Sequence, residues 1–285
     1  MKQVKGFTIR TVVWLFVLFT VAQYVCAQVP RQEAWIVLNA GLTDKTASER
    51  AIAVRVLALI NNDPQAPELA MKALDDPKPE VRAAAAEAVG QLKYQAAIPK
   101  LREILLSDED DVSVVLECAG ALIELGDNDG YAVYYAVLTG ERKTGLGLVD
   151  SHKKMLSDPK KMAQFGFEQG IGYIPFAGIG YGVVKAVNKD DESPVRAAAA
   201  KKLINDPDPQ TQEALVNTSN DKSWVVRMAV VDALARRNDP AVIPLLEPRL
   251  SDDKDVVKYS AAAAIIRLTD LQESTGMLPA PATGK

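Results

Sequence analysis

DDPKPEVRAAAAEAVGQL, residues Asp75 to Leu92, is the stretch that decides the fold. It joins an acidic, proline-containing turn to an alanine-rich run with apolar residues at positions i, i+4, i+7 and i+8. These positions are Val81, Ala85, Ala88 and Val89. They share one face of a predicted helix, and alanine favours helices that pack closely through small side chains.

The same pattern recurs along the chain. The other copies lie at residues 43–60, 108–125, 190–203, 220–237 and 251–268. Several copies continue into a second apolar segment with a proline in its first turn, where the missing N–H costs nothing. These prolines are Pro67, Pro99 and Pro244. Each unit is therefore a predicted helical hairpin that cannot bury its apolar face alone, and stacked hairpins form a solenoid.

The units resemble HEAT repeats, in the short bacterial form also seen in phycobilisome-lyase-like HEAT proteins. The resemblance rests on the acidic turn followed by a V-R-x-x-A-A-x-A-L pattern, and it covers most of residues 35–268. It implies an all-α fold, a right-handed α-α superhelix of the HEAT or armadillo type.

Two polar columns run through the units. An aspartate precedes the first helix in five units, and a basic residue follows six positions later. The aspartates are Asp44, Asp76, Asp190, Asp221 and Asp252, and the basic residues are Arg50, Arg82, Arg196, Arg227 and Lys258. The third unit departs, with Glu109 and Val115. We expect the aspartate to cap its helix and the basic residue to bond the neighbouring unit, as the ladders of HEAT proteins imply, rather than form a catalytic array.

The basic column jumps by 81 residues between Val115 and Arg196, against 31 to 33 elsewhere. Residues 140–188 are therefore predicted to be an insertion between the third and fourth units. The insertion holds nine of the 17 glycines, which predicts a helical hairpin with close backbone contact. Its break in the helical pattern is GIGYIPFAGIGYG at residues 170–182.

The aromatic and aliphatic residues of this insertion are candidates for contact with a partner protein or with lipid. They are Tyr173, Ile174, Phe176 and Tyr181. The alternative is that the hairpin packs on itself and on the solenoid. Trp224, in the turn before a repeat helix, is a further candidate, as a partner anchor or as packing between units.

The N-terminus reads as a secretory signal peptide over residues 1–27. Three basic residues precede the apolar run at 11–22, and a small-residue cleavage site fits at 25–27. We therefore predict an exported protein, periplasmic or extracellular. The alternative is an uncleaved N-terminal membrane anchor, because residues 11–30 carry no charge.

The predicted organisation after the signal is repeats 1–3 at residues 28–139, the insertion at 140–188, repeats 4–6 at 189–268 and a disordered tail at 269–285. Without residues 1–27 the chain has 30 basic against 37 acidic side chains, a net charge of −7. A nucleic-acid partner is not expected, because such proteins need a basic surface to release counterions.

No catalytic, cofactor-binding or metal-binding residues are predicted. His152 is the one histidine and reads as an exposed loop residue, and with Cys118 as the one cysteine after residue 27 a zinc site is not expected. Gly140 to Gly147 is no phosphate loop, because Leu146 and Gly147 stand where Lys and Ser/Thr should follow the second glycine. Cys118 falls on the inward alanine column, as an inert core residue.

These features predict a non-catalytic exported scaffold that binds another protein along its solenoid. Two alternatives stay open at this stage. The phycobilisome-lyase-like resemblance implies an enzyme or an enzyme-accessory role, and the insertion at 140–188 could give peripheral membrane contact.

Overall fold

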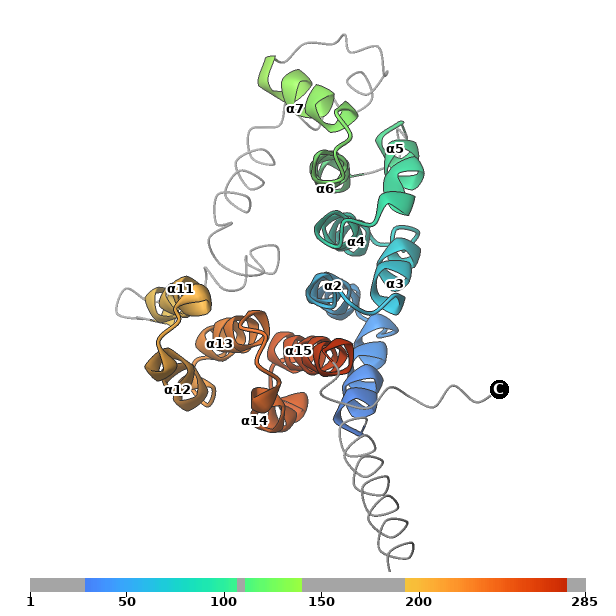
Figure 1. The fold of residues 1–285 in the computed structure, drawn as a ribbon. Coiled ribbons are helices and arrows are strands. Elements are labelled where there is room, and N and C mark those ends of the chain that lie inside the picture. The colour runs from blue at the N-terminus through green and yellow to red at the C-terminus, as the bar shows by residue number, and fades with distance from the viewer. Residues whose placement is uncertain (1–28, 107–110, 140–192, 276–285) are drawn as a thin grey trace, which may run out of the picture.

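The computed structural model describes residues 29–106, 111–139 and 193–275 (Figure 1). The described residues form helices joined by short turns and 3₁₀ segments, with no strand among them. The predicted signal peptide at 1–27 and the predicted insertion at 140–188 lie outside these ranges, as do the candidate residues Asp190, Tyr173, Ile174, Phe176 and Tyr181.

Each unit is a helical hairpin. Its first helix carries the alanine column. The first helices are α2 (Ala47–Val56), α4 (Pro79–Gln91), α6 (Val112–Glu124), α11 (Ser193–Lys202), α13 (Trp224–Arg236) and α15 (Asp255–Ser274). The second helices are α3 (Gln65–Ala73), α5 (Ile98–Leu106), α7 (Asp129–Thr139), α12 (Pro209–Thr218) and α14 (Ile243–Leu246), the last extended by a 3₁₀ segment at Glu247–Ser251. Residues 29–42 form a further helix before unit 1.

The first helices are buried on almost every side because their side chains are small. In α4, Ala84, Ala85, Ala86 and Ala88 are fully buried. Gly90 lies so close to α6 that a Cβ atom there would stand 2.9 Å from the Cα of Ala121. Such close approach lets each first helix cover its neighbours, which no isolated hairpin can do.

The units do not stack in the order of the chain. The first helices form one row in the order α11, α13, α15, α2, α4, α6, so unit 6 packs on unit 1 (Figure 1). Units 3 and 4 stand at opposite ends, although they are consecutive units of the sequence. Two blocks, units 4–6 and units 1–3, thus meet through α15 and α2, and one core cluster runs through both.

The helix at 29–42 takes the place of a second helix for unit 6. Figure 1 shows it in line with α3 and α5 and beside the end of α15. Ala34 and Leu38 are fully buried, and Gly41 lies against the ring of Tyr259 in α15 and the methyl group of Ala53 in α2. The two ends of the described chain therefore meet in the middle of the stack.

The end of the last repeat differs from the sequence prediction. Residues 269–285 were predicted as a disordered tail, but α15 continues to Ser274. Thr269 is fully buried and Asp270 is 8 % exposed, because the helix at 29–42 covers this part of α15. The prediction failed because the covering helix comes from the opposite end of the sequence. Residues 276–285 lie outside the described ranges.

Gly41 gives a test of this closure. A Cβ atom at residue 41 would lie 2.6 Å from the Tyr259 ring and 2.9 Å from the Cβ of Ala53. We expect Gly41→Ala to lower the free energy of unfolding by about 1–3 kcal/mol, the usual cost of overpacking a core. Urea unfolding followed by circular dichroism measures the change.

Gly120→Ala is the matched control, because Gly120 is also helical and a Cβ atom there would meet only the Tyr134 hydroxyl, at 3.2 Å. Because alanine has the higher helix propensity, the free energy of unfolding of this variant should equal that of the original chain or exceed it by about 1 kcal/mol. Equal stability of the two variants would contradict the close contact at Gly41.

Candidate functional site

The row of first helices presents a continuous side that the second helices do not cover. We call it the inner face and define it by α11, α13, α15, α2, α4 and α6. Figure 1 shows the row turning a corner near α15, with the second helices on the outside of the turn. The inner face therefore crosses from one block to the other without a gap in the row of helices.

Basic residues of one unit reach the aspartate of the next along this row. Arg50 donates from Nε and Nη2 to the two carboxylate oxygens of Asp76, both at 2.8 Å. Arg196 makes the same kind of contact with Asp221. We call each such contact a rung. The planar guanidinium matches a carboxylate in two places, so a rung fixes orientation as well as distance.

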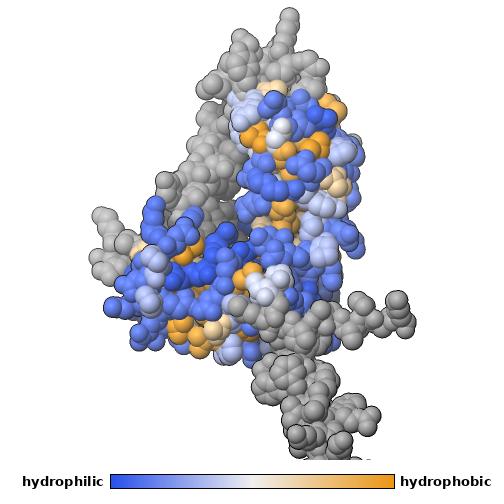
Figure 2. All heavy atoms as spheres, in the orientation of Figure 1, coloured by the Kyte–Doolittle hydropathy of each residue, from blue (hydrophilic) through white to orange (hydrophobic). Residues whose placement is uncertain are grey.

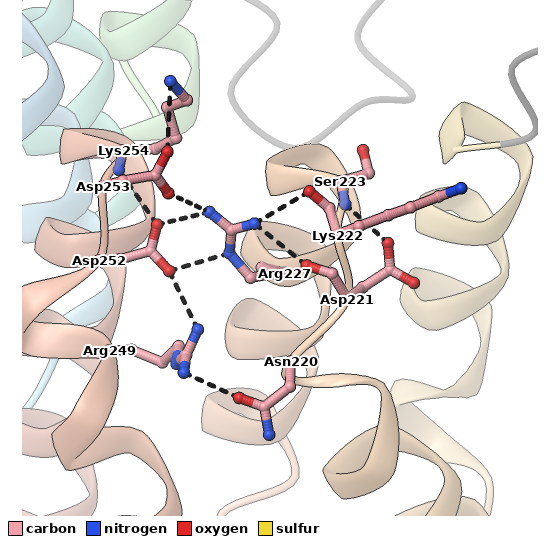
Figure 3. A network of polar contacts seen from close by, with 9 residues as sticks. All are labelled: Asn220, Asp221, Lys222, Ser223, Arg227, Arg249, Asp252, Asp253 and Lys254. Atoms are coloured by element: carbon pink, nitrogen blue, oxygen red, sulfur yellow. Dashed lines mark hydrogen bonds and ion pairs between the residues drawn. The ribbon is translucent and has the colours of Figure 1, made fainter.

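Arg227 forms the most extensive rung (Figure 3). Its Nε and Nη2 bond the carboxylate of Asp252 at 2.9 and 2.7 Å, and Nη2 also bonds Asp253 at 2.6 Å. Its Nη1 donates to the carbonyl oxygens of Asp221 and Lys222. The Arg227 side chain is 9 % exposed and that of Asp252 is 2 % exposed, so water screens this pair poorly.

The aspartates act on the turn rather than as helix caps. Asp44, Asp76, Asp221 and Asp252 each accept from the backbone N–H two residues further on. That N–H belongs to the N-cap residue, immediately before the helix, whose own side chain makes no capping bond. The capping role expected from sequence is therefore corrected to a local turn that aims the carboxylate at the preceding unit.

The rungs shift the pKa values of these carboxylates. The hydrogen bonds from Arg50 hold the pKa of Asp76 below its usual value. Burial alone would raise the pKa of Asp252, but its bonds from Arg227 and from the Lys254 N–H lower it. Burial would also raise the pKa of Asp221, but its hydrogen bonds from Arg196 lower it.

The other members of the two columns are placed as follows. Arg82 donates to the carbonyl oxygen of Asp76 at 2.8 Å. Lys258 forms an ion pair within its own helix, with Asp255, and its charge helps to lower the pKa of Asp44 after the bonds from Thr46. Val115, where the basic column fails, is buried in α6.

A second set of contacts, which the repeat pattern did not predict, links the outer helices. Arg31 bonds Asp63 at 2.6 Å, Arg102 bonds Asp127 at 2.8 Å, and Gln212 bonds Asp239 at 3.1 Å. The acceptor aspartates are alike in accepting from the N–H two residues on, at the start of a second helix or 3₁₀ turn. The shared position of these aspartates in the sequence could have indicated the acceptors. The donors could not be predicted, because they differ in residue type and in their position within the unit.

Trp224 is the one partner-binding candidate within the described residues. It is the first residue of α13 and is half-buried. Its ring packs against the main core and against a small second cluster of Met228, Val256 and Val257, which Ile52 of α2 also contacts. Trp224 thus contributes to packing between units near the point where the two blocks meet.

Among the described residues, no group of three or more His, Cys, Asp or Glu side chains is arranged to hold a metal ion. Cys118 is fully buried among alanine and leucine side chains. None of the described helices is long and apolar enough to cross a membrane.

Comparison with known families gives one clear result. HEAT repeats match residues 37–129 and 182–266, which is more than half of the chain. The chain belongs to the HEAT-repeat family. The first matched region includes α2 to α6 and the second includes α11 to most of α15, so each falls on one of the two blocks.

Two further comparisons add little. A solved structure of human deoxyhypusine hydroxylase in complex with glycerol is 16 % identical, with 85 % of this chain and 98 % of that chain covered. The TM-score is 0.32, too low for the likeness to carry an argument. A comparison with curated proteins gives no match.

The Arg227 rung predicts a large stability effect. Arg227→Met keeps the aliphatic length but leaves the buried carboxylate of Asp252 with only Arg249 as a cationic partner. We expect a loss of about 3–5 kcal/mol in the free energy of unfolding, measured by urea titration. Lys254→Met is the control, since its pair with Asp253 joins side chains that are 50 % and 69 % exposed, and it should cost less than about 1 kcal/mol.

The lowered pKa of Asp76 predicts a dependence on pH. A carboxyl group whose folded pKa lies below its unfolded value stabilises the fold above the unfolded pKa, and this contribution disappears as pH falls through the folded pKa. Stability should therefore fall as the pH decreases below about 4. In Arg50→Met the pKa of Asp76 returns toward its usual value, so the acid slope should be shallower in urea titrations at stepped pH. An unchanged slope would contradict the role of the rung.

Proposed function

We propose that this HEAT-repeat protein is an exported, non-catalytic scaffold that binds another protein along its inner face. The observation that carries the proposal is the uninterrupted row of first helices across both blocks. Solenoids of stacked helix pairs use such extended faces to bind partners. Export rests on the signal-like residues 1–27.

The chemistry of the described surface supports binding rather than catalysis. The most conspicuous charged residues, those of the two columns, are engaged in contacts between and within units. On the face shown in Figure 2, the described residues are mainly hydrophilic with separate apolar patches. Among the large apolar side chains left exposed, Leu106, Tyr131 and Tyr134 belong to α5 and α7 near one end of the stack. Polar surfaces with separate aromatic residues are typical of non-obligate protein interfaces.

The test compares two triple variants with the same change in net charge. Ser48→Lys, Glu80→Lys and Gln91→Lys alter exposed residues of the inner-face helices α2 and α4. Gln210→Lys, Glu213→Lys and Asn217→Lys alter exposed residues of the outer helix α12. Circular dichroism and thermal unfolding should show that both variants fold, since exposed substitutions usually change stability by less than about 0.5 kcal/mol.

The readout is affinity capture of proteins from an envelope extract, quantified by mass spectrometry. We expect a protein captured by the original chain to be lost, at least tenfold, with the inner-face variant and retained with the α12 variant. If the two variants capture equally, or if no protein is enriched by the original chain, the inner face is not the binding surface.

A further inference from the structure

The junction between the two blocks is built differently from the rungs within each block. Glu49 in α2 stands in the repeat position that holds Val81, Val114, Val226 and Val257 in other units. Its Oε2 is buried without a hydrogen-bond partner, and Asp255 of α15 lies close enough to help raise the pKa of Glu49. A buried carboxyl oxygen without a partner favours the protonated form, because burial disfavours the charge.

Several charged groups surround this pair on the inner side of the junction. Asp44 lies in the turn before α2, while Lys258 and Tyr259 lie on α15. Lys258 pairs with Asp255. The charges of Arg50 and Lys258 both lower the pKa of Asp44, after the bonds from Thr46. Burial, and then the interaction with Asp255, raises the pKa of Glu49, against the charge of Lys258. Burial beside Asp255 and Glu49 raises the pKa of Tyr259 to about 12.

The outer side of the junction repeats this excess of carboxyl groups. Arg31 of the helix at 29–42 bonds Asp63 at 2.6 Å and Asp270 of α15 at 2.8 Å. One guanidinium group therefore pairs with two carboxylates, those of Asp63 (2 % exposed) and Asp270 (8 % exposed). The second oxygen of Asp270, Oδ2, is buried without a hydrogen-bond partner. Burial raises the pKa of Asp270 to about 6, against the pull of Arg31 and with the help of Asp63 and Glu273.

Arg267 also spans the junction but does not neutralise these carboxylates. Its guanidinium donates to the Leu59 carbonyl oxygen at 3.1 Å and to Asn61 Oδ1 at 2.5 Å in unit 1. It also donates to Ala235 and Asn238 in unit 5. Burial, and then the nearby charge of Arg236, lowers the pKa of Arg267.

The contrast with the rungs is the key observation. Within the blocks, the rungs at Asp76, Asp221 and Asp252 have cationic partners, and their pKa values are lowered. At the junction, Glu49 and Asp270 have shifts of the opposite sign. The rungs within the blocks therefore favour charged carboxylates, whereas the junction holds two carboxyl groups, Glu49 and Asp270, that favour the protonated form.

We propose that the contact between α15, α2 and the helix at 29–42 is a proton-controlled hinge that loosens when Glu49 and Asp270 lose their protons, while each block stays folded. The loosening follows from charge. When both groups ionise, unpaired negative charge accumulates on either side of a poorly hydrated contact. Separating the blocks returns these carboxylates to water.

The direction and size of the effect follow from linkage. A carboxyl group whose pKa is raised in the closed state stabilises closure below its pKa in the open state, near 4, and this stabilisation is lost as pH rises through about 6. For Asp270 alone, the equilibrium constant for opening should rise about tenfold between pH 5 and pH 8. Glu49 adds to the same trend.

Native-state hydrogen exchange of the full chain measures this opening. Labelling times at pH 5 and pH 8 are scaled for intrinsic exchange, and peptides are compared by mass spectrometry. We expect protection in the helix at 29–42 and in α15 to fall about tenfold or more at pH 8, while α4 and α13 keep theirs. Equal protection of the junction at both pH values, or an equal loss in α4 and α13, would overturn the proposal.

Variants separate the hinge from general effects of pH. Glu49→Val restores the column residue, and Asp270→Asn keeps an acceptor for Arg31 without the titratable charge. The double variant should show protection of α15 that is independent of pH within about twofold. Asp76→Asn, a rung within a block, should leave the tenfold change in place. A tenfold change that persists in the double variant would refute the assignment to these two groups, and the original chain still gives the first test if a variant fails to fold.

Discussion

An alanine-rich helix cannot bury its apolar face by itself, and every level of this structure follows from the need to cover that face. Alanine side chains are small, so cover requires neighbouring helices on several sides at close range. Within a block, the next unit covers this face. At unit 6 the cover comes instead from α2 and the helix at 29–42, which pack against α15. The closure makes one stack from two blocks.

Two kinds of buried polar groups lie in the stack, those of the rungs within a block and those of the junction between the blocks. Rungs such as Arg227–Asp252 are repeated because each unit offers the next one the same turn and the same carboxylate. Their guanidinium groups balance the cost of burying a carboxylate. The junction joins surfaces that are not successive units, so its side chains depart from the repeat. Glu49 replaces a valine, and Arg31 serves two aspartates. Stability within blocks and stability between blocks thus respond to pH in opposite directions.

This division bears on function through the shape of the inner face. A partner that spans the inner face on both sides of α15 would bind both blocks and would therefore sense the angle between them. A hinge that responds to protons would change the affinity for such a partner without any change in the contact residues. The coupling need be only about 1–3 kcal/mol to alter binding several-fold. Trp224 lies beside the junction, packed on Met228 and Val256, and is placed to respond to the same movement.

The sequence by itself determined the units, their hairpin form and the two polar columns. These are local properties, because helix periodicity, prolines in first turns and a repeat of about 31 to 33 residues are all read within one or two units. The inward position of Cys118 could be read from the same register. Only the tertiary structure decided the order of the units, the fate of residues 269–274 and the pairing of Arg31 with Asp63 and Asp270. Asp270 and Arg31 lie 239 residues apart, and no periodic pattern links them. Their contact exists because the last alanine face must be covered, and the cover comes from the other end of the chain.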